Sequence, residues 1–227
     1  MSAIFVTATG TDVGKTFVAA SLIRHLRRLG HAVDAIKPVV SGFDPAQAAT
    51  SDPGILLEAL GAPVTPHEIE RIAPWRFRDP VSPDLAAARE GRRIDVDQVT
   101  AFCQSAVAQH RGVLLIEGVG GIMVPLDGER TILDVMMALR LPLILVAGSY
   151  LGTISHTLTA LRVLAQRNLT VAAVAVSASV APGAPLDETV ATIGRFADLI
   201  EVVGVPRLTG DAHRHPAIAR LATLIEG

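Results

Sequence analysis

The chain lacks three features: paired cysteines, an excess of charge of either sign, and any long apolar run. Its 227 residues include one cysteine, Cys103, so no disulfide can form within the chain and a reducing compartment is favoured. The net charge of −2 provides no basic field to attract nucleic acid. The longest apolar run, 141–148, is too short to span a bilayer, and the chain begins with strand-like sequence rather than a signal segment. These absences predict a soluble cytoplasmic protein that binds neither nucleic acid nor membrane.

Half of the residues are hydrophobic and 19% are charged, a balance typical of a globular α/β protein. A chain of this length can bury one sizeable core, and no repeat or linker divides it. We therefore expect residues 1–227 to form one domain. Apolar neighbours surround Cys103 along the chain, which favours a packed thiol over a nucleophile.

Short apolar runs alternate with stretches of helical periodicity along most of the chain. The runs are apolar on both faces, as in parallel strands that helices cover on each side. This alternation predicts a doubly wound, mostly parallel sheet with right-handed crossovers. The expected strands are 3–6, 32–36, 113–116, 143–147, 171–176 and 202–205, and the expected helices are 17–29, 96–109, 131–139, 153–166, 186–197 and 212–225.

Residues 41–95 interrupt this alternation. The segment is rich in proline, glycine and aspartate. Such a composition predicts short helices and loops rather than a second domain. Because ligands gather at the carboxyl ends of parallel strands, we expect this insertion to cover the active-site end of the sheet.

The segment from Thr9 to Thr16, Thr-Gly-Thr-Asp-Val-Gly-Lys-Thr, lies between the first expected strand and the first expected helix. A glycine-bearing turn that opens a helix on Gly-Lys-Thr is typical of a P-loop, the phosphate-binding loop of many nucleotide-binding proteins. Its backbone N–H groups favour an anion, Lys15 can reach the outer phosphates, and the Thr16 hydroxyl can bind Mg²⁺. Thr9 stands where the common pattern has glycine, so the segment is either a deviant P-loop or another glycine-rich turn.

A second lysine, Lys37, follows the second expected strand. Beside a P-loop, it can place another positive charge over a transferring phosphoryl group. The alternative is an ordinary lysine whose stem lies along the edge of the sheet. Ser41 is either a turn residue before Gly42 or a hydroxyl within reach of the same phosphoryl group.

Two carboxylates are candidate metal ligands. Glu117 ends a hydrophobic strand, as in the Walker-B arrangement, where the carboxylate holds Mg²⁺ opposite the P-loop hydroxyl. An unpaired glutamate there would be costly to desolvate, which favours a nearby cation. Asp52 precedes Pro53 and is either a helix N-cap or a second metal ligand. Gly118 and Gly120 allow the backbone to approach a ligand closely.

The strand expected at 143–147 leads into Gly148-Ser149-Tyr150-Leu151-Gly152-Thr153-Ile154-Ser155-His156. Here a second strand turns into a helix N-terminus, which is favourable for an anionic group such as a substrate carboxylate. The alternative is a plain turn with Thr153 as the helix cap.

Together these motifs resemble the dethiobiotin synthetase family, carboxylating ligases of the biotin pathway that carry a deviant P-loop. The resemblance covers nearly the whole chain, and the order of the motifs makes it specific. The motifs are Thr7–Thr16, Lys37–Val39 with Ser41–Gly42, Ser51–Asp52, Pro80–Pro83, Glu117–Gly121 with Pro125–Leu126, Leu151–Gly152 with His156, and Gly204–Pro206.

The resemblance implies an ATP- and Mg²⁺-dependent closure of a cyclic urea from 7,8-diaminopelargonic acid and CO₂ or bicarbonate, which gives dethiobiotin, ADP and phosphate. One amine takes up CO₂ as a carbamate, the γ-phosphate activates the carbamate, and the second amine attacks it. Lys15 and Lys37 would bracket the γ-phosphate and the carbamate, with Thr11 and Ser41 as nearby donors. The family is homodimeric, so a homodimer is expected.

The resemblance also implies a binding role for each matched residue. The implied metal ligands are Thr16, Asp52 and Glu117. The implied substrate-binding residues are Lys37, Ser41, Leu151, Gly152, Thr153 and Ile154. The resemblance places the substrate carboxylate at the helix start Gly152–His156, bound across the subunit interface. The implied nucleotide-binding residues are Thr11, Asp12, Val13, Gly14, Lys15, Thr16, Phe17, Glu117, Gly118, Gly120, Gly204 and Pro206.

One departure from the family pattern leaves the nucleotide preference open, because Val176-Ser177-Ala178-Ser179 lacks the Asn-Asp pair that reads adenine in the family. Two other functions share the fold type. A partitioning-type P-loop ATPase switch would carry a lysine at the position of Gly10. A cobyrinate-type amide synthase would need a glutamine-hydrolysing domain, for which this chain is too short.

Overall fold

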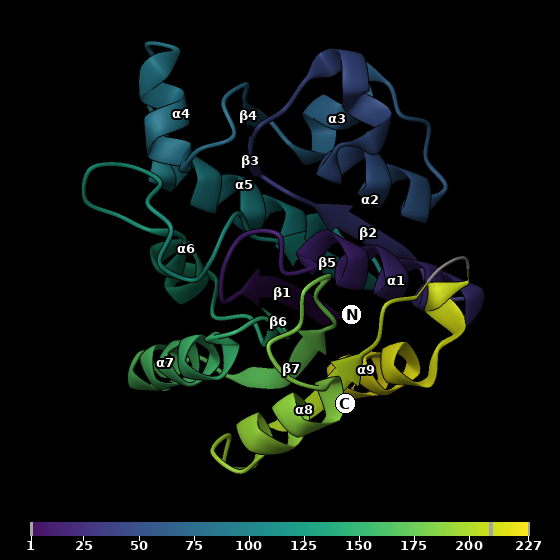
Figure 1. The fold of residues 1–227 in the computed structure, drawn as a ribbon. Helices are drawn as coiled ribbons and strands as arrows, with labels where there is room; N and C mark the ends of the chain where they lie inside the picture. The colour runs from purple at the N-terminus through teal and green to yellow at the C-terminus, as the bar shows by residue number, and fades with distance from the viewer. Residues whose placement is uncertain (1, 209–210, 227) are drawn as a thin grey trace.

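A sheet of six parallel strands forms the centre of the structure, a computed structural model that describes residues 2–208 and 211–226 (Figure 1). The strands are β1 (Ser2–Ala8), β2 (Val33–Ile36), β5 (Val113–Glu117), β6 (Leu143–Gly148), β7 (Val171–Ser177) and β8 (Glu201–Val205). Their order is β2-β5-β1-β6-β7-β8, and every neighbouring pair is parallel. The predicted doubly wound parallel sheet is confirmed.

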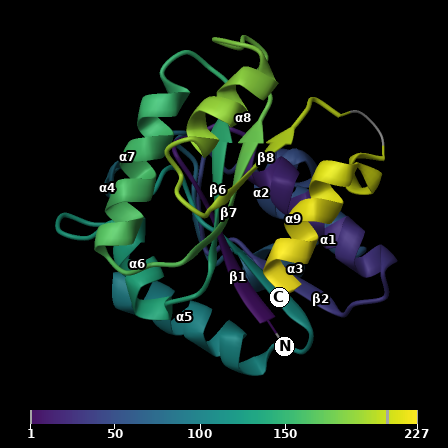
Figure 2. The same cartoon turned by 90° about the horizontal axis from the view of Figure 1, so that it is seen from below.

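Helices cover both faces of this sheet (Figure 2). One face carries α1 (Lys15–Arg28) and α9 (Pro216–Glu226), and the other carries α5 (Val96–Gln109), α6 (Ile132–Leu139), α7 (Thr153–Gln166) and α8 (Leu186–Gly194). None of the helices in the described part of the chain is both long and apolar enough to cross a membrane.

The sequence predicted the bounds of α5 and α7 and erred at two other helices. The expected helix 212–225 is divided, because the 3₁₀ turn η2 (Ala212–Arg214) comes first and α9 starts anew at Pro216, where proline suits a first helical turn. The expected helix 186–197 ends at Gly194, a residue type that weakens helices.

Residues 41–95 form short elements that the sheet does not include. They are η1 (Pro45–Thr50), α2 (Asp52–Leu60), α3 (Pro66–Ile72) and α4 (Pro83–Arg89), each with proline in its first turn. The sequence missed a small parallel pair formed by β3 (Val39–Ser41) and β4 (Trp75–Phe77). Three residues are too few to show the alternation that identifies a strand.

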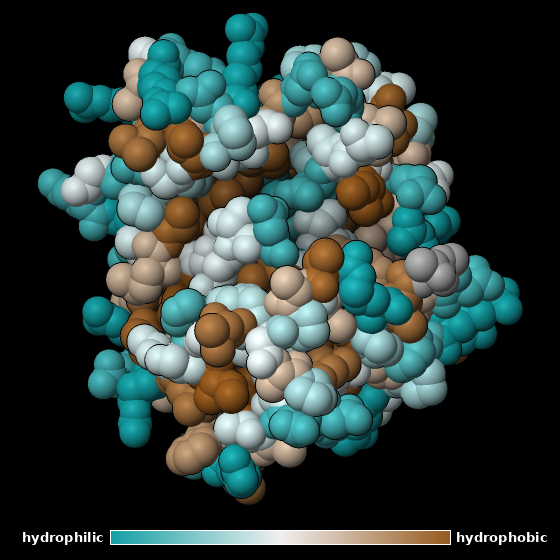
Figure 3. All heavy atoms as spheres, viewed as in Figure 1, coloured by the Kyte–Doolittle hydropathy of each residue, from teal (hydrophilic) through white to brown (hydrophobic). Residues whose placement is uncertain are grey.

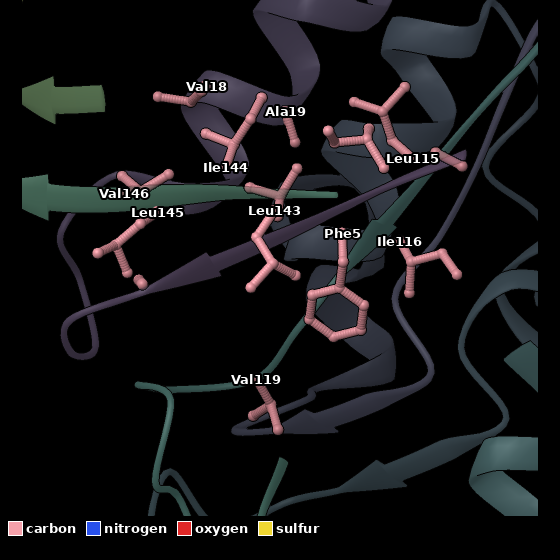
Figure 4. Close-up of a cluster of buried hydrophobic side chains, with 14 of the residues drawn as sticks. Phe5, Val18, Ala19, Leu115, Ile116, Val119, Leu143, Ile144, Leu145 and Val146 are labelled. Carbon is pink, nitrogen blue, oxygen red and sulfur yellow. The ribbon is translucent and has the colours of Figure 1, made fainter. Parts of the chain in front are cut away.

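The main core lies where α1 packs on the central strands, and Figure 4 shows side chains of β1, β5, β6 and α1 in one cluster. Phe5, Ile116 and Val146 are among its fully buried members. Burying a side chain of this size contributes about 1.5–3 kcal/mol. This packing fixes the carboxyl ends of β1 and β5, which carry the residues described next.

Candidate active site

A cavity of about 730 Å³ opens at the carboxyl end of the sheet. Figure 3 shows the surface hollowed between the insertion, in the upper part of the view, and the centre of the molecule. The cavity brings together residues that the sequence places far apart. It is lined by Thr11, Asp12, Gly14, Lys15, Thr16, Phe17, Lys37, Val40, Ser41, Gly42, Asp52, Pro80, Val81, Ser82, Pro83, Val119, Gly120 and Val124.

Two residues in left-handed conformation shape the loop between β1 and α1. Asp12 has φ 57° and Gly14 has φ 96°. A Cβ atom at Gly14 would lie 2.6 Å from the Ser177 Oγ atom, so both the backbone angle and the available space require glycine. The turn lets α1 begin at Lys15 beside the cavity, where the unpaired N–H groups of its first turn favour an anion.

Lys15 is a buried cation at this helix start. Its side chain donates to the Gly10 carbonyl oxygen at 3.0 Å, and only 6% of the residue is exposed. Burial first, and then the neighbouring charge of Lys37, lower the pKa of Lys15 to about 8. A phosphate placed beside Lys15 would oppose both effects, because an opposite charge favours the protonated amine.

Lys37 stands one residue beyond β2 and ends in a cluster with two carboxylates. Its Nζ atom donates to Asp52 Oδ2 at 2.5 Å and to Glu117 Oε1 at 2.5 Å. The Lys37 and Glu117 side chains are 4% and 1% exposed, whereas the Asp52 side chain is 44% exposed. The sequence predicted Lys37 over a phosphoryl group, but in this structure its ammonium contacts the carboxylates at the wall of the same cavity.

The pKa values of this cluster show that the ion pairing outweighs desolvation. Burial alone would lower the pKa of Lys37, but the charges of Glu117 and Asp52 raise it above its ordinary value. Burial alone would raise the pKa of Asp52, but the Lys37 ammonium holds it below the usual range. Both Lys37 and Asp52 are therefore charged at neutral pH.

The three predicted metal ligands converge on this cluster. The Thr16 hydroxyl donates to Glu117 Oε1 at 2.7 Å, while Glu117 Oε2 is buried and has no hydrogen-bond partner among the described residues. Two carboxylates and a hydroxyl fit Mg²⁺, which usually takes one or two carboxylates and completes its shell with water and phosphate oxygens. No group of three or more His, Cys, Asp or Glu side chains that could hold a metal occurs in the described residues, so this smaller set is the candidate.

The helix-cap alternative for Asp52 is wrong. Ser51 is the N-cap of α2, and its hydroxyl accepts a hydrogen bond from the Gly54 N–H at 3.3 Å. Asp52 begins the helix and is free to turn its carboxylate towards Lys37.

A second cavity, of about 310 Å³, adjoins the P-loop at the ends of β7 and β8. It is lined by Asp12, Val13, Gly14, Phe17, Ser177, Ala178, Ser179, Val180, Pro206, Arg207 and Leu208. Ser179 is held by a reciprocal pair of 2.9 Å hydrogen bonds with Ser149, in which each hydroxyl accepts from the other residue's backbone N–H. The sequence had already pointed to most of this lining, namely the P-loop residues, Ser177–Ser179 as the position of the absent Asn-Asp pair, and Pro206. It missed Val180, Arg207 and Leu208, although following every strand end would have found them.

Two predicted nucleotide-binding glycines lie outside both cavities. Gly204 is in β8 and packs against α8. A Cβ atom at Gly118 would lie 2.8 Å from the Phe5 ring, so Gly118 serves the packing of β1. Gly120, in contrast, lines the larger cavity with φ 59°.

The start of α7 lies apart from both cavities within one chain. Leu151 is 88% exposed, and Gly152 caps the helix with φ 98° and no side-chain cap. Thr153 is not the cap, because its hydroxyl donates to the Gly148 carbonyl oxygen at 2.6 Å. None of the residues Leu151–Ile154, which include the cap Gly152, lines the cavity that holds Lys37 and Ser41.

One sequence feature of the site could have been read directly. Lys15 and Lys37 are the only lysines among the 20 lysine and arginine residues of the chain. Both line the larger cavity. A flexible, compact ammonium is therefore used only at this site, and every other strongly basic side chain is a guanidinium.

Comparisons with known proteins show the family of the chain. A family model described as an AAA domain matches residues 2–210. The ATP-dependent dethiobiotin synthetase BioD of Acidiphilium cryptum (strain JF-5) is 50% identical over 190 residues, which cover 83% of this chain and 85% of the relative. The enzyme of the same name from Caulobacter sp. (strain K31) is 50% identical over 209 residues, which cover 91% and 89%.

Among solved structures, the MinC:MinD cell division protein complex of Aquifex aeolicus aligns with 100% of this chain and 95% of its own chain, with a TM-score of 0.53 and 13% identity. That likeness shows the shared fold alone. Identity near one half over most of the chain is a much stronger relation. The chain belongs to the dethiobiotin synthetase family.

Proposed function

We propose that this protein is an ATP-dependent dethiobiotin synthetase, a ligase of biotin biosynthesis that converts 7,8-diaminopelargonic acid, CO₂ and ATP to dethiobiotin, ADP and phosphate. The observation that carries the proposal is the convergence of Lys15, Lys37 and Asp52 on one cavity beside a P-loop, with Glu117 bound to Lys37 at the wall of that cavity. Its support from relatives is the name that the similar proteins share.

The reaction takes place in three steps. One amine of the substrate adds to CO₂ and loses a proton to give a carbamate. A carbamate oxygen then attacks the γ-phosphorus of ATP, and ADP leaves. The second amine attacks the carbonyl carbon of the resulting carbamic–phosphoric anhydride, phosphate leaves, the nitrogen loses a proton, and the cyclic urea closes.

The chain supplies charge and position for these steps. Lys15 and Lys37 hold the γ-phosphate and the carbamate between two positive charges, and the Thr11 and Ser41 hydroxyls line the same cavity as donors. Electrostatic stabilisation by positive groups that face developing negative charge is commonly the largest contribution to lowering the activation barrier. Holding the reactants together can contribute about 7–11 kcal/mol more.

Thr16, Asp52 and Glu117 are the residues that would hold Mg²⁺, which supplies charge neutralisation to the phosphates when bound. The smaller cavity at Ser177–Val180 and Pro206 is the place for the nucleobase, because it adjoins the P-loop on the side away from Lys37. Among the described residues that line it, no side chain carries an amide group that could read adenine by paired hydrogen bonds. We therefore expect turnover with CTP and GTP as well as with ATP.

A homodimer is part of the proposal. In one chain the start of α7 is separate from the larger cavity, and Leu151 beside it is 88% exposed. A second copy would cover Leu151 and bring Gly152–Ile154 to the substrate carboxylate, where a helix N-terminus favours an anion. Light scattering should give the mass of two chains, and Leu151→Asp should shift it towards one.

We also place the protein in the cytoplasm, since its single thiol is unpaired and buried.

The test is substrate-dependent turnover. Phosphate release from ATP and Mg²⁺ is expected only when the diamine and bicarbonate are both present, with dethiobiotin detected by mass spectrometry in equal amount. Lys37→Ala should lower turnover by about 10²-fold or more, as for loss of one oxyanion donor, and keep nucleotide binding. Phosphate release at an unchanged rate without the diamine would instead indicate a partitioning-type ATPase switch, and consumption of glutamine would indicate an amide synthase.

A further inference from the structure

The two carboxylates proposed as metal ligands, Asp52 and Glu117, are bound to the ammonium of Lys37 in this structure. Lys37 Nζ lies 2.5 Å from an oxygen of each carboxylate, and Thr16 shares the same Glu117 oxygen. We propose that the Lys37 ammonium and a divalent cation are alternative occupants of one cation site, and that arrival of the metal moves the ammonium into the cavity. This inference rests on the proposed function only in assigning a metal to the site.

The charges of the cluster favour one cation at a time. Asp52 and Glu117 carry two negative charges, and the side chains of Lys37 and Glu117 are almost fully buried. A metal bound to the same oxygens as Lys37 would lie within a few ångströms of the ammonium, and like charges in a water-poor site repel strongly. The two cations therefore exclude each other from the carboxylates.

The cluster also has unused capacity for a metal. Glu117 Oε2 is buried and has no hydrogen-bond partner in the described residues, although a buried carboxylate oxygen normally has one. An ammonium satisfies only Oε1 of Glu117. A divalent cation can take oxygens from both carboxylates together with the Thr16 hydroxyl, which is a donor set that Mg²⁺ accepts.

The displaced ammonium of Lys37 can move into the adjoining cavity. The Lys37 backbone is fixed by its N–H, which donates to the Ile72 carbonyl oxygen at 2.9 Å. The side chain lies at the wall of the 730 Å³ cavity that Thr11 and Ser41 also line. Four rotatable bonds let the ammonium leave the carboxylates while the backbone stays in place. Metal binding would thus deliver the second lysine to the reacting groups, and nucleotide would bind to a site with both cations in place.

The opposite interpretation is a permanent ion pair that only ties β2, α2 and β5 together. In that case Lys37 and the metal would be independent of each other. The difference between the two interpretations is measurable without turnover, in protein that holds no nucleotide.

The chain offers a direct probe, because Lys15 and Lys37 are its only lysines. Protein grown with ¹³Cε-labelled lysine should give two lysine signals, which Lys15→Met and Lys37→Met assign by removing one each. Titration with Mg²⁺ should move the Lys37 signal to a saturating new position, and the Glu117→Gln variant should lose this change. A Lys37 signal that stays in place while Mg²⁺ binds overturns the proposal.

Metal affinity gives an independent measurement. By electron paramagnetic resonance of Mn²⁺ without nucleotide, Lys37→Met should bind Mn²⁺ about tenfold or more tightly than the original chain, a ratio typical of coupled sites. The double variant Lys37→Met/Glu117→Gln should lose the gain. Equal affinity in Lys37→Met and the original chain contradicts the proposal.

The experiments distinguish a failure of the cation exchange from a variant that does not fold and from a failure of the proposed function. If Lys37→Met is unfolded without metal, recovery of its circular dichroism on adding Mn²⁺ supports the exchange, and lack of recovery contradicts it. Diamine-dependent turnover of the original chain is measured apart from these titrations. Its absence would refute the synthetase activity and leave the cation exchange standing, whereas an immobile Lys37 with full turnover would refute the exchange alone.

Discussion

Replacing Lys37 by methionine is the sharpest test of the buried cluster as a stabilising element. Methionine keeps most of the volume of the stem but leaves Glu117, 1% exposed, without its cation. Removing one partner of a buried pair costs about 3–5 kcal/mol, because the other charge stays buried. We expect the lower end, about 3 kcal/mol, because Asp52 is nearly half exposed and the adjoining cavity admits water.

The measurements are urea unfolding for the free energy of unfolding and thermal unfolding for the melting temperature, both followed by circular dichroism without metal or nucleotide. In a chain of this size each kcal/mol lowers the melting temperature by about 2–4 °C, so Lys37→Met should lose about 6–12 °C. The matched control is Lys37→Met/Glu117→Gln, which removes both buried charges and should lie within about 1 kcal/mol of the original chain. A Lys37→Met variant as stable as the original, or a double variant less stable than the single one, would refute the reasoning.

Four further outcomes are expected. Gly14→Ala adds left-handed strain of about 1–2 kcal/mol and a contact with the Ser177 hydroxyl, so ATP affinity by calorimetry should fall about tenfold, and Ser177→Gly should restore part of it. Lys15→Met should abolish nucleotide binding yet stabilise the fold by on the order of 2 kcal/mol at about pH 7, because the folded pKa of about 8 penalises the charged amine. For the same reason the stability of the original chain relative to Lys15→Met should rise in urea as the pH goes from about 8 to 10.5. This comparison cancels the opposing titration of Cys103, which both chains share, and a constant difference between the two chains would contradict the reasoning. Burial raises the pKa of Cys103 to about 12. Its thiol should therefore react with an aromatic disulfide reagent only as fast as the whole protein unfolds. Rapid labelling of the native protein would instead indicate local opening of α5, the helix that carries Cys103.

The sheet could be predicted because its strands are buried on both faces. Residues 113–117 and 143–147 are buried without exception, and an uninterrupted apolar run of that length is typical of a central parallel strand. The helices that precede the first of these strands and follow the second show the spacing of a covered face, so α5 and α7 were predicted to the residue. Local pattern and tertiary burial agree in this part of the chain.

The remaining elements depend on contacts that local sequence does not encode. Strands β3 and β4 exist because Val39–Ser41 meets Trp75–Phe77 across an intervening segment. Thr153 looks like a helix cap, but its hydroxyl turns back to a strand carbonyl. In each case a long-range or backward contact replaced the local interpretation.

The candidate site also has features that the sequence predicted and features that depend on long-range contacts. The sequence predicted that the P-loop, Lys37 and Glu117 would meet, because each ends or follows a strand at one edge of a parallel sheet. Asp52 begins α2 instead, and only the resemblance to the family placed it at the site. It did not predict which group would pair with Lys37, since Glu117 is 80 residues away and no local pattern records that contact. Gly118 and Gly204 were assigned from their motifs, but their surroundings show a packing role.

The distribution of lysine and arginine follows from what each cation must do. Arginines on the surface hold carboxylates with several N–H groups at once, as Arg71 does with Asp34 and Glu68, and as Arg130 does with Asp97 and Asp127. Such forked contacts are strong and fixed in direction. A guanidinium at position 37 would grip the carboxylates in the same fixed way and would have to break paired hydrogen bonds to release them. An ammonium forms a single contact with each carboxylate and can carry its charge to another anion by bond rotation alone. A cation that serves the carboxylates in one state and a phosphoryl group in the next therefore has to be lysine.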